Sequence, residues 1–353
     1  SRTTPSSPSW PGYFEMKVLV TGSAGHLGEA LQRALREKDA ETLGIDIKPS
    51  AFTDRVGSIA DPKFVEDCMS GVDAVIHAAT LHKPHVATHS RQDFVDTNVT
   101  ATLNLLEAAT RAGVGSFVFT STTATFGDAM RPGPGEPAVW VTEELVPQPR
   151  NIYGVTKTAA ENLCQLFHRN QGLPCIVLRT SRFFPEDDDN RFKRAEFDDD
   201  NLKVNELLFR RADIADMVSA HERAIEMAPE VGFDRLIVSA TTPFDRSEAA
   251  ELGEDASAVL KRHFPEYEEQ YRRRGWKMFL SIGRVYDNSR ARKVLAWEPE
   301  YSFEQAVARL EADEDYRSPL ARQVGAKGYH EVDFEDGPFP VEETPEIEAG
   351  HDR

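Results

Sequence analysis

The chain has 353 residues, 40% of them hydrophobic, which is enough for one large α/β domain or for a domain with a smaller partner. Its 59 acidic and 41 basic residues give a net charge of −18, and this argues against a nucleic-acid partner, because nucleic-acid surfaces are basic. No apolar run approaches the roughly 20 residues of a membrane span, and the three cysteines lack CxxC spacing. We therefore expect a cytoplasmic protein without a membrane partner, a disulfide framework or a bound metal.

Short apolar runs alternate with helical patterns along the first half of the chain. Residues 1–15 contain no apolar signal region and are expected to form a flexible leader. Apolar runs that end in turn residues predict buried strands at 16–22, 41–47, 73–79 and 174–180, and the run 116–127 predicts a further strand with its exit loop. Helical spacing of apolar residues predicts helices at 26–38, 91–112 and from Tyr153 to about 170. This alternation predicts an α/β fold with a doubly wound parallel Rossmann sheet.

The pattern changes after Thr180. Residues 16–180 are predicted to form the cofactor-binding domain, and a helix and strand at about 212–240 are predicted to return to its sheet. The segments 181–211 and 241–315 contain the irregular stretches 181–201 and 241–283, and they are interpreted as one small C-terminal substrate domain over the carboxyl ends of the strands. Residues 316–353 are predicted to form an acidic, solvated tail.

The stretch TGSAGHLG, from Thr21 to Gly28, follows the first strand and opens the first helix. Its glycines permit a tight turn at which backbone N–H groups and the helix N-terminus meet a pyrophosphate. Asp46 ends the second strand, where a carboxylate accepts hydrogen bonds from ribose hydroxyls and repels a 2′-phosphate. The predicted cofactor is therefore NAD rather than NADP.

The stretch NIYGVTK places Tyr153 four residues before Lys157, on one face of a helix. A surface pair would show the same spacing, so the motif needs the context of the dinucleotide site. Further motifs are HAA at 77–79, NVTATLNLLEAA from Asn98, FTSTTATFG at 119–127 and DNSRARKVLAWEP from Asp287. With these motifs, the chain from Met16 to Leu310 resembles the extended short-chain dehydrogenase/reductases of the nucleotide-sugar epimerase/dehydratase type.

The resemblance implies a role for each matching residue. Tyr153 would be the catalytic acid and base, Lys157 would bind the nicotinamide ribose and depress the pKa of the tyrosine, and Thr122 would bond the reacting oxygen. Asn98 would contact the cofactor, hold the active-site helix or a water, or simply cap a helix. NAD would be contacted by Tyr153, Lys157 and Asn98 together with Gly22, Ala24, Gly25, His26, Leu27, Gly28, Asp46, Ile47, Ala78, Ala79 and Ser121. The substrate would meet His82, Lys83, Thr123 and Arg182.

Two local clusters contain residue types that can bind a metal ion. His85 and His89 stand four residues apart, but with His82 they offer no evident fourth ligand. The acidic runs 187–189 and 198–200 lack the glycine and distal glutamate of a calcium loop, and a solvated lid is expected there.

Three departures from the family pattern bear on the reaction. Thr123 and Ala124 stand where the dehydratases have an Asp-Glu pair, so a 4,6-dehydratase is not expected. Arg182 replaces the Asn of the LRxxN motif, and the segment 184–210 is short for a nucleotide pocket. The open alternatives are a sugar epimerase, a dehydrogenase or reductase on a non-nucleotide substrate, and a non-catalytic dinucleotide-binding regulator. The resemblance also implies a homodimer that pairs through the helices at 91–112 and 153–170.

Overall fold

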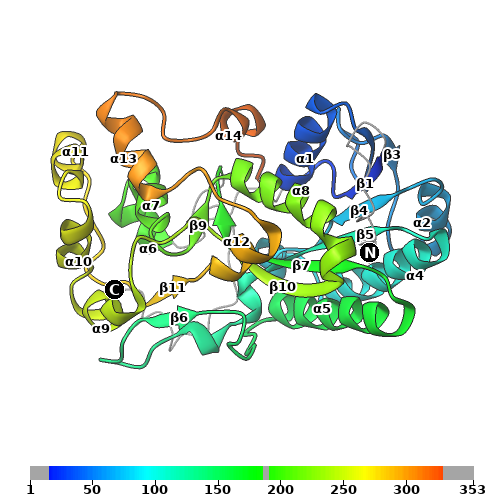
Figure 1. Ribbon diagram of the computed structural model, residues 1–353, viewed down its shortest axis with the longest axis horizontal. Coiled ribbons are helices and arrows are strands. Elements are labelled where there is room, and N and C mark those ends of the chain that lie inside the picture. The colour runs from blue at the N-terminus through cyan, green and yellow to red at the C-terminus, as the bar shows by residue number, and fades with distance from the viewer. Residues whose placement is uncertain (1–15, 186–190, 329–353) are drawn as a thin grey trace, which may run out of the picture.

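The computed structural model describes residues 16–185 and 191–328. A seven-stranded parallel sheet fills the right-hand part of the molecule in Figure 1. In their order across the sheet the strands are β10 (Phe233–Val238), β7 (Cys175–Thr180), β5 (Ser116–Thr122), β4 (Ala74–His77), β1 (Lys17–Thr21), β2 (Glu41–Asp46) and β3 (Arg55–Val56). The strand order changes direction between β1 and β4, which confirms the predicted doubly wound sheet.

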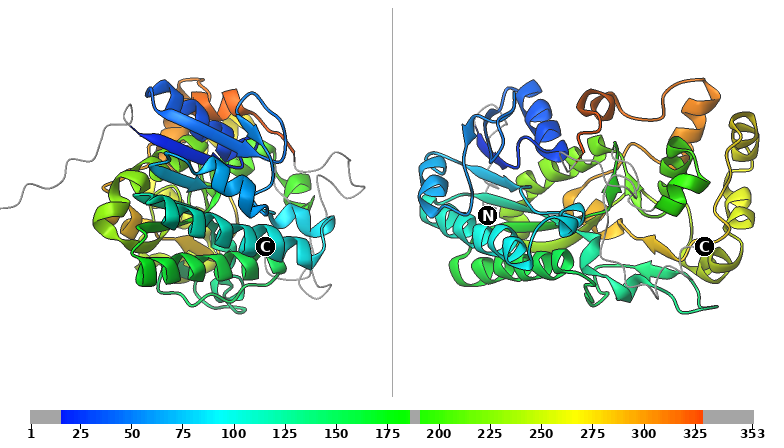
Figure 2. Two further views of the ribbon diagram at one scale, coloured as in Figure 1. Left: turned by 90° about the vertical axis from the view of Figure 1, so that its right-hand side faces the viewer. Right: turned by 180° about the vertical axis from the view of Figure 1, so that it is seen from behind.

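Helices cover both faces of this sheet (Figure 2). Side chains alternate along β1, so that Val18 and Val20 belong to one core cluster and Leu19, between them, to the other. The first cluster lies under α1 (His26–Glu37) and α8 (Ile214–Val231). The second lies under α2 (Pro62–Cys68), α4 (Ala101–Ala112) and α5 (Ile152–Gln171). The carboxyl ends of the strands therefore open at one edge, between the two helical layers.

The long helix expected at 91–112 is interrupted in the structure. Its first part, α3 (Arg91–Val95), is joined to α4 by a π-helical turn, Asp96–Thr100. Single π-turns inside helices occur frequently at functional sites, because the extra residue redirects a side chain. Here the turn carries Asn98, which is buried.

The left-hand end of the molecule in Figure 1 is helical, although the sequence predicted irregular chain at 181–201 and 241–283. The aromatic rings of Phe197 and Phe279 meet there at 5.0 Å in an edge-to-face contact, which joins chain from these two segments. Because these helices are short, their sequences show no clear helical period. They are α6 (Arg191–Glu196), α7 (Asp199–Glu206), α9 (Ala249–Glu254), α10 (Ala256–His263), α11 (Tyr267–Arg274) and α13 (Phe303–Glu311). A further short helix, α12 (Ser289–Leu295), packs instead against α8 and β10.

Two small parallel sheets, which the sequence did not predict, connect this helical end with the main sheet. One pairs β6 (Val139–Val141) with β11 (Arg284–Tyr286). The other pairs β8 (Arg182–Phe183) with β9 (Arg211–Ala212). Both sheets carry arginines at the point where the helical end meets the strand ends.

The tail expected from residue 316 begins later than predicted. Residues 319–324 form α14 (Pro319–Val324), and its Ala321 and Val324 are buried against α1 and α8. The hydroxyl of Ser318 donates to Asp213 Oδ1 at 2.5 Å, so the residues before α14 are also fixed. The predicted leader at 1–15, the acidic run at 187–189 and the acidic residues after 328 lie outside the described residues.

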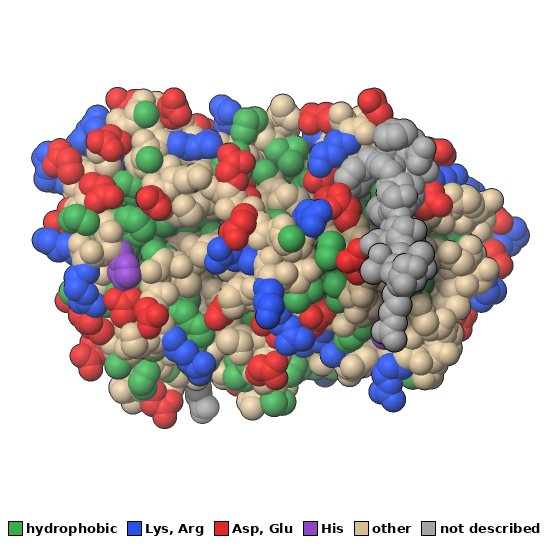
Figure 3. Space-filling view, in the orientation of Figure 1, with side chains coloured by type: hydrophobic (Ala, Val, Ile, Leu, Met, Phe, Trp, Pro, Cys, Tyr) green, Lys and Arg blue, Asp and Glu red, His purple; other side chains and the backbone are tan. Residues whose placement is uncertain are grey.

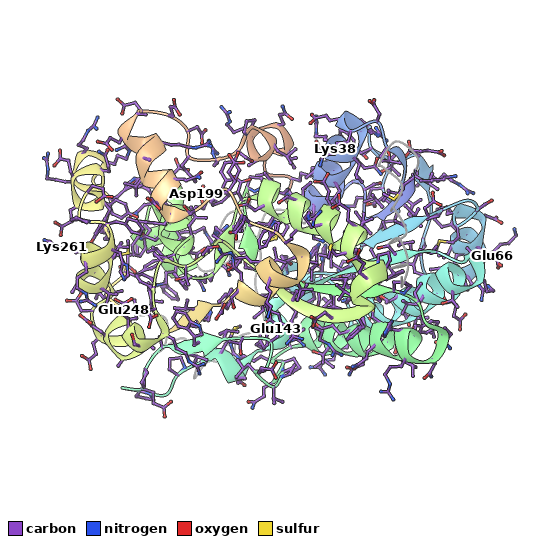
Figure 4. The ribbon with its side chains drawn as sticks, viewed as in Figure 1. Lys38, Glu66, Glu143, Asp199, Glu248 and Lys261 are labelled. Carbon is purple, nitrogen blue, oxygen red and sulfur yellow. The ribbon has the colours of Figure 1, made fainter. Side chains whose placement is uncertain are left out.

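Acidic and basic side chains are mixed over the face of the molecule shown in Figure 3. Many of them pair on the surface of the helical end. Lys261 lies 2.9 Å from Glu268, and Glu248 lies 2.9 Å from His263 (Glu248 and Lys261 are labelled in Figure 4). Of the helices in 16–185 and 191–328, none combines the length and the apolarity needed to cross a membrane.

Candidate active site

A cleft of about 1510 Å³ lies along the carboxyl ends of the main strands. Single small-molecule sites measure roughly 300–1,000 Å³, so this cleft has room for a dinucleotide and a second ligand. The glycine-rich turn lines one end of it, and residues of the helical end line the other. The predicted site residues that line it are Gly22, Ala24, Gly25, His26, Leu27, Gly28, Asp46, Ile47, Ala78, Ala79, His82, Lys83, Ser121, Thr122, Thr123, Tyr153 and Arg182.

The glycine-rich turn leaves no space for side chains at two of its glycines. Gly22 has a φ of +73°, and a Cβ there would stand 2.8 Å from the backbone nitrogen of Ala79 on the neighbouring strand. A Cβ on Gly28 would stand 2.0 Å from the carbonyl oxygen of Gly22. The N-cap of α1 is Gly25, which offers no side chain to the first turn of the helix. The N–H groups of that turn are therefore directed at a ligand in the cleft, as a pyrophosphate requires.

Asp46 stands beside this turn at the end of β2. One of its carboxylate oxygens accepts from the backbone N–H of Ala24 at 3.0 Å, and the other accepts from the N–H of Lys48 at 2.9 Å. The carboxylate is thus fixed against the glycine-rich turn, in the position where the adenosine ribose of a dinucleotide would lie. Ile47, which is 66% exposed, forms a wall of the cleft next to it.

Tyr153 and Thr122 meet where α5 begins. The side chain of Asn151 caps α5 by accepting from the N–H of Gly154 at 3.0 Å. A Cβ on Gly154 would come within 2.9 Å of the carbonyl oxygen of Ala124, so glycine is needed for the helix to approach the exit loop of β5 this closely. This approach brings the side chains of Tyr153 and Thr122 together at the cleft.

Lys157 is buried beneath this pair. Its ammonium group donates to the carbonyl oxygen of Thr120 at 2.6 Å and lies 4.1 Å from the centre of the Phe119 ring. Burial lowers the pKa of Lys157 to about 7, although the nearby Glu161 and Cys164 favour the charged form. Lys157 does not line the cleft, so its expected contact with the nicotinamide ribose stays a prediction.

The pKa of Tyr153 differs from the expectation. Burial raises it to about 12, and the hydrogen bond with Thr122 offsets only part of this effect. The sequence interpretation had Lys157 depressing this pKa toward neutrality. Desolvation of the phenolate dominates because Tyr153 is buried, and burial has also lowered the tendency of Lys157 to hold a proton.

Asn98 and Ser121 are directed into the protein rather than at a ligand. The amide of Asn98 accepts from the N–H of Leu81 at 2.9 Å and donates to the hydroxyl of Thr156 at 3.0 Å. Asn98 does not line the cleft, and it ties α5 to the loop after β4, which fits the expectation that it holds the active-site helix. Ser121 lines the cleft, but its hydroxyl donates to Glu161 at 2.6 Å.

Sequence reasoning missed Glu161 as a member of this site. Its carboxylate is buried and receives a hydrogen bond from Arg179 at 2.7 Å in addition to that from Ser121. It follows Lys157 by four residues on α5, a spacing that places both side chains on one face of the helix and that could have revealed it.

Three histidines extend the wall of the cleft from Tyr153 outward. The rings of His82 and Tyr153 are 6.3 Å apart, and the ring of His85 stacks on His82 at 5.6 Å. Nδ1 of His85 accepts from the backbone N–H of His82 at 2.9 Å. Burial, and then the neighbouring His85 and Lys157, hold the pKa of His82 well below its usual range. Among residues 16–185 and 191–328, no group of three or more His, Cys, Asp or Glu side chains could hold a metal ion.

Arginines gather at the other end of the cleft, around the buried Glu206. Its carboxylate accepts from Arg210 at 2.8 Å and from Arg211 at 2.6 Å, and Arg182 lies 4.0 Å away. Burial alone would raise the pKa of Glu206, but these arginines hold it far below its usual range. The arginines that line the cleft are Arg131, Arg150, Arg182, Arg210, Arg211 and Arg284.

Comparison with known sequences identifies the family. A sequence model of the NAD dependent epimerase/dehydratase family matches residues 18–198, just over half of the chain. The chain belongs to this family. Its members are NAD-dependent enzymes, so the predictions of an enzyme and of NAD as its cofactor are confirmed.

Individual relatives of the family are epimerases and dehydratases. The chain is 27% identical over 320 residues to a UDP-glucose 4-epimerase of Rhizobium meliloti (strain 1021), and the match covers 81% of the chain and 93% of that protein. It is 30% identical to an uncharacterized UDP-glucose epimerase of Bacillus subtilis (strain 168), with 46% of the chain and 55% of that protein covered. The chain spans only about half of the length of this protein, and a similar share of another relative from Sinorhizobium fredii.

Solved structures show the same fold. A UDP-N-acetylglucosamine 4-epimerase from Bacillus cereus superposes with a TM-score of 0.60 at 19% identity, covering 84% of the chain and 98% of that structure. A short-chain dehydrogenase/reductase superfamily protein from Agrobacterium tumefaciens with bound NAD gives a TM-score of 0.62 at 24% identity, with 87% and 97% covered. The predicted fold class is confirmed.

The cleft of this family member fits NAD. The side-chain-free turn at Gly22 and Gly28 leaves room for the close approach of a pyrophosphate. The fixed carboxylate of Asp46 supplies the acceptor for the ribose hydroxyls. When bound, NAD supplies a nicotinamide ring that accepts and returns a hydride.

Proposed function

We propose that this enzyme acts on a secondary hydroxyl group of a nucleotide sugar and transfers its hydride to and from NAD, with Tyr153 as the acid and base. The leading specific reaction is 4-epimerisation of a UDP-hexose. The observation that carries the proposal is the position of Tyr153 and Thr122 at the cleft, with Lys157 buried one helical turn further along α5. A non-catalytic regulator would not need this arrangement, and the family consists of enzymes.

The proposed roles follow from the chemistry of each side chain. Tyr153 takes the proton of the substrate hydroxyl and returns it after the hydride has moved, while Thr122 holds the reacting oxygen by a hydrogen bond. Lowering the pKa of Tyr153 from about 12 to near 7 requires roughly 7 kcal/mol of selective stabilisation of the phenolate. A protonated Lys157 contributes to this, since its positive charge favours the phenolate.

The charge around the cleft supports an anionic substrate. Arg182, Arg210 and Arg211 line this end of the cleft and present guanidinium groups there. Guanidinium groups bind phosphate in a bidentate manner. A sugar diphosphate fits this end of the cleft, with the sugar toward Tyr153. The pair that follows Thr122, Thr123 and Ala124, lacks the carboxylates expected for a dehydratase.

A second candidate is an NAD-dependent dehydrogenase or reductase on a non-nucleotide substrate. The observation that favours it is Arg182, which replaces the Asn of the LRxxN motif and lines the cleft. An arginine at this place suits a single carboxylate as well as a diphosphate.

One experiment separates the two candidates. The purified protein is analysed for bound NAD and then incubated with UDP-glucose, UDP-galactose and their N-acetyl and uronic forms. We expect NAD to co-purify and at least one pair of sugars to interconvert, because an epimerase regenerates its cofactor. No interconversion, together with release of NADH on a non-nucleotide alcohol, would contradict the epimerase and support the dehydrogenase.

NAD is expected to bind at least about tenfold more tightly than NADP. A 2′-phosphate would meet the carboxylate of Asp46, which its two backbone hydrogen bonds prevent from turning away. Fluorescence titration with both cofactors measures the ratio. Asp46→Ser should lower the ratio of the NAD affinity to the NADP affinity. Asp67→Ser on the surface of α2 is the matched control and should leave this ratio unchanged. Equal affinities in the natural protein would refute the role of Asp46.

We propose in addition that the protein is a homodimer that pairs through α4 and α5. On α5, Val155 is 48% exposed and Leu166 is 43% exposed, whereas Phe167 is buried against the sheet. Exposed apolar side chains along one helix are typical of a subunit contact. Light scattering at micromolar concentration should give twice the chain mass, and Leu166→Glu should lower it. A monomer mass for the natural protein would contradict the proposal.

A further inference from the structure

Residues close to the end of the described chain reach the glycine-rich turn. The backbone N–H of Lys327 donates to Nε2 of His26 at 2.8 Å. The ammonium group of Lys327 donates to the carbonyl oxygen of Ala24 at 2.9 Å and also pairs with Glu29. Lys327 and Gly328 line the same cleft as the turn itself. The glycine-rich turn and the segment at Lys327, which are about 300 residues apart in the sequence, therefore form one wall of the cleft.

The preceding helix fixes this segment in place. The buried Ala321 and Val324 of α14 pack against α1 and α8. Gly325, with a φ of +64°, ends α14 and turns the chain toward the N-terminus of α1. The position of Lys327 is thus determined by packing and by a specific turn, as well as by its hydrogen bonds.

A negative charge near the N-terminus of α1 is balanced by a cation. Glu29 lies in the first turn of this helix, and its side chain is only 10% exposed. Burial would raise the pKa of Glu29, but hydrogen bonds from Lys327 and Arg33 bring it below its ordinary value, so the carboxylate is ionised. An ionised carboxylate beside the glycine-rich turn repels a pyrophosphate. The ammonium group of Lys327 pairs with this carboxylate and donates to the carbonyl oxygen of Ala24 in the turn.

We propose that Lys327 is a cofactor-binding residue that attracts the pyrophosphate of the dinucleotide from the C-terminal side of the cleft. The cofactor site then extends well beyond residues 18–198, the part of the chain that matches the family. The ligand class is a dinucleotide diphosphate. The inference rests on NAD as the cofactor and does not depend on the sugar substrate.

The test compares three ligands on the full chain by calorimetry: NAD, ADP-ribose and adenosine. Lys327→Gln should lower the affinity for NAD and for ADP-ribose at least about tenfold, because both ligands carry the pyrophosphate. The affinity for adenosine should change less than about twofold. The salt dependence of NAD binding should also become shallower, because one charge contact is lost. Lys327→Arg should restore most of the affinity.

Arg322→Gln is the matched control, since Arg322 is an exposed cation on α14 that does not line the cleft. This variant should bind all three ligands like the natural protein. Unchanged NAD affinity in Lys327→Gln would overturn the proposal. An equal loss for adenosine would also overturn it, because the segment would then act by shaping the cleft and not by its charge. These outcomes are independent of turnover, so they stand apart from a failure of the proposed reaction.

Discussion

Tyr153→Phe is expected to reduce turnover by a factor of roughly 10²–10⁴ and to leave NAD binding within about twofold. The substitution removes only the hydroxyl group, to which we assign the proton transfer, and keeps the ring that lines the cleft. Hydride transfer from a secondary alcohol leaves a carbonyl only if the hydroxyl proton also departs, so without an acceptor the reaction stops. Steady-state rates on the identified substrate and calorimetry with NAD measure the two effects.

A matched control is available in Tyr267, another buried tyrosine. Its hydroxyl bonds Ser257 at 2.9 Å in the helical end, away from the cleft residues. Tyr267→Phe should keep the full rate. If Tyr153→Phe kept a rate within a few-fold of the natural enzyme, another group would have to carry the proton, and the catalytic assignment of Tyr153 would be wrong.

Those features of the cleft that depend on local spacing were predictable from the sequence. The glycine-rich turn between β1 and α1 needs glycines because a Cβ would meet the neighbouring backbone, and this requirement is visible as a motif. The position of Asp46 at the cleft was predictable because the apolar run of the second strand ends at this residue. Tyr153 and Lys157 were predictable because both lie on α5, one helical turn apart.

Features that depend on contacts between distant segments were not predictable. Glu206 and the arginines around it come together through α7 and the small sheet of β8 and β9, whose strands have two residues each and leave no pattern. Lys327 hydrogen-bonds His26, although the two residues lie near opposite ends of the described sequence. The helical end likewise contains contacts between distant segments, such as that of Phe197 with Phe279.

The raised pKa of Tyr153 in the cofactor-free chain was not predictable for a related reason. The charges of a site can be read from its residue types, and they favoured the phenolate. Burial cannot be read in this way, because it depends on the close approach of α5 to the exit loop of β5 that Gly154 permits. In this site desolvation is the larger effect, for Tyr153 and for Lys157 alike.

Lys157→Met is expected to stabilise the cofactor-free protein at pH 7 by roughly 3 kcal/mol while it abolishes turnover. A free lysine titrates near ~10.4, so a pKa of about 7 in the fold means that burying the ammonium group costs about 5 kcal/mol. Methionine fills a similar volume without this cost. It forfeits the hydrogen bond to the carbonyl oxygen of Thr120, which accounts for roughly 1–2 kcal/mol.

The stabilisation should depend on pH in a defined way. Below pH 7, Lys157 is protonated in the folded and the unfolded chain, so the full cost is present. Between pH 7 and about 10.4 the folded chain releases its proton while the unfolded chain keeps it, and the cost declines as the pH rises. Above this range it vanishes. The difference in unfolding free energy between variant and natural protein should therefore be constant below pH 7 and shrink toward pH 10.

Urea unfolding between pH 6 and pH 10 measures this difference. Lys63→Met is the matched control, because Lys63 has a side chain that is 82% exposed and pairs only weakly with Asp67 at 3.1 Å. Its effect should stay within about 0.5 kcal/mol at every pH. Destabilisation by Lys157→Met, or a difference independent of pH, would show that the ammonium group is well solvated in the fold and that its pKa is not depressed.

A lysine that destabilises its own fold is intelligible only through the neighbouring tyrosine. Tyr153 needs a positive charge nearby to release its proton, and that charge acts most strongly where water is excluded. The same exclusion of water makes the charge costly to bury. With a pKa of about 7, Lys157 is still half protonated at neutral pH, so the cation is present where the phenolate must form. Replacing it with an apolar residue should therefore gain stability and lose catalysis in one step, and the two effects together would distinguish a functional lysine from a structural one.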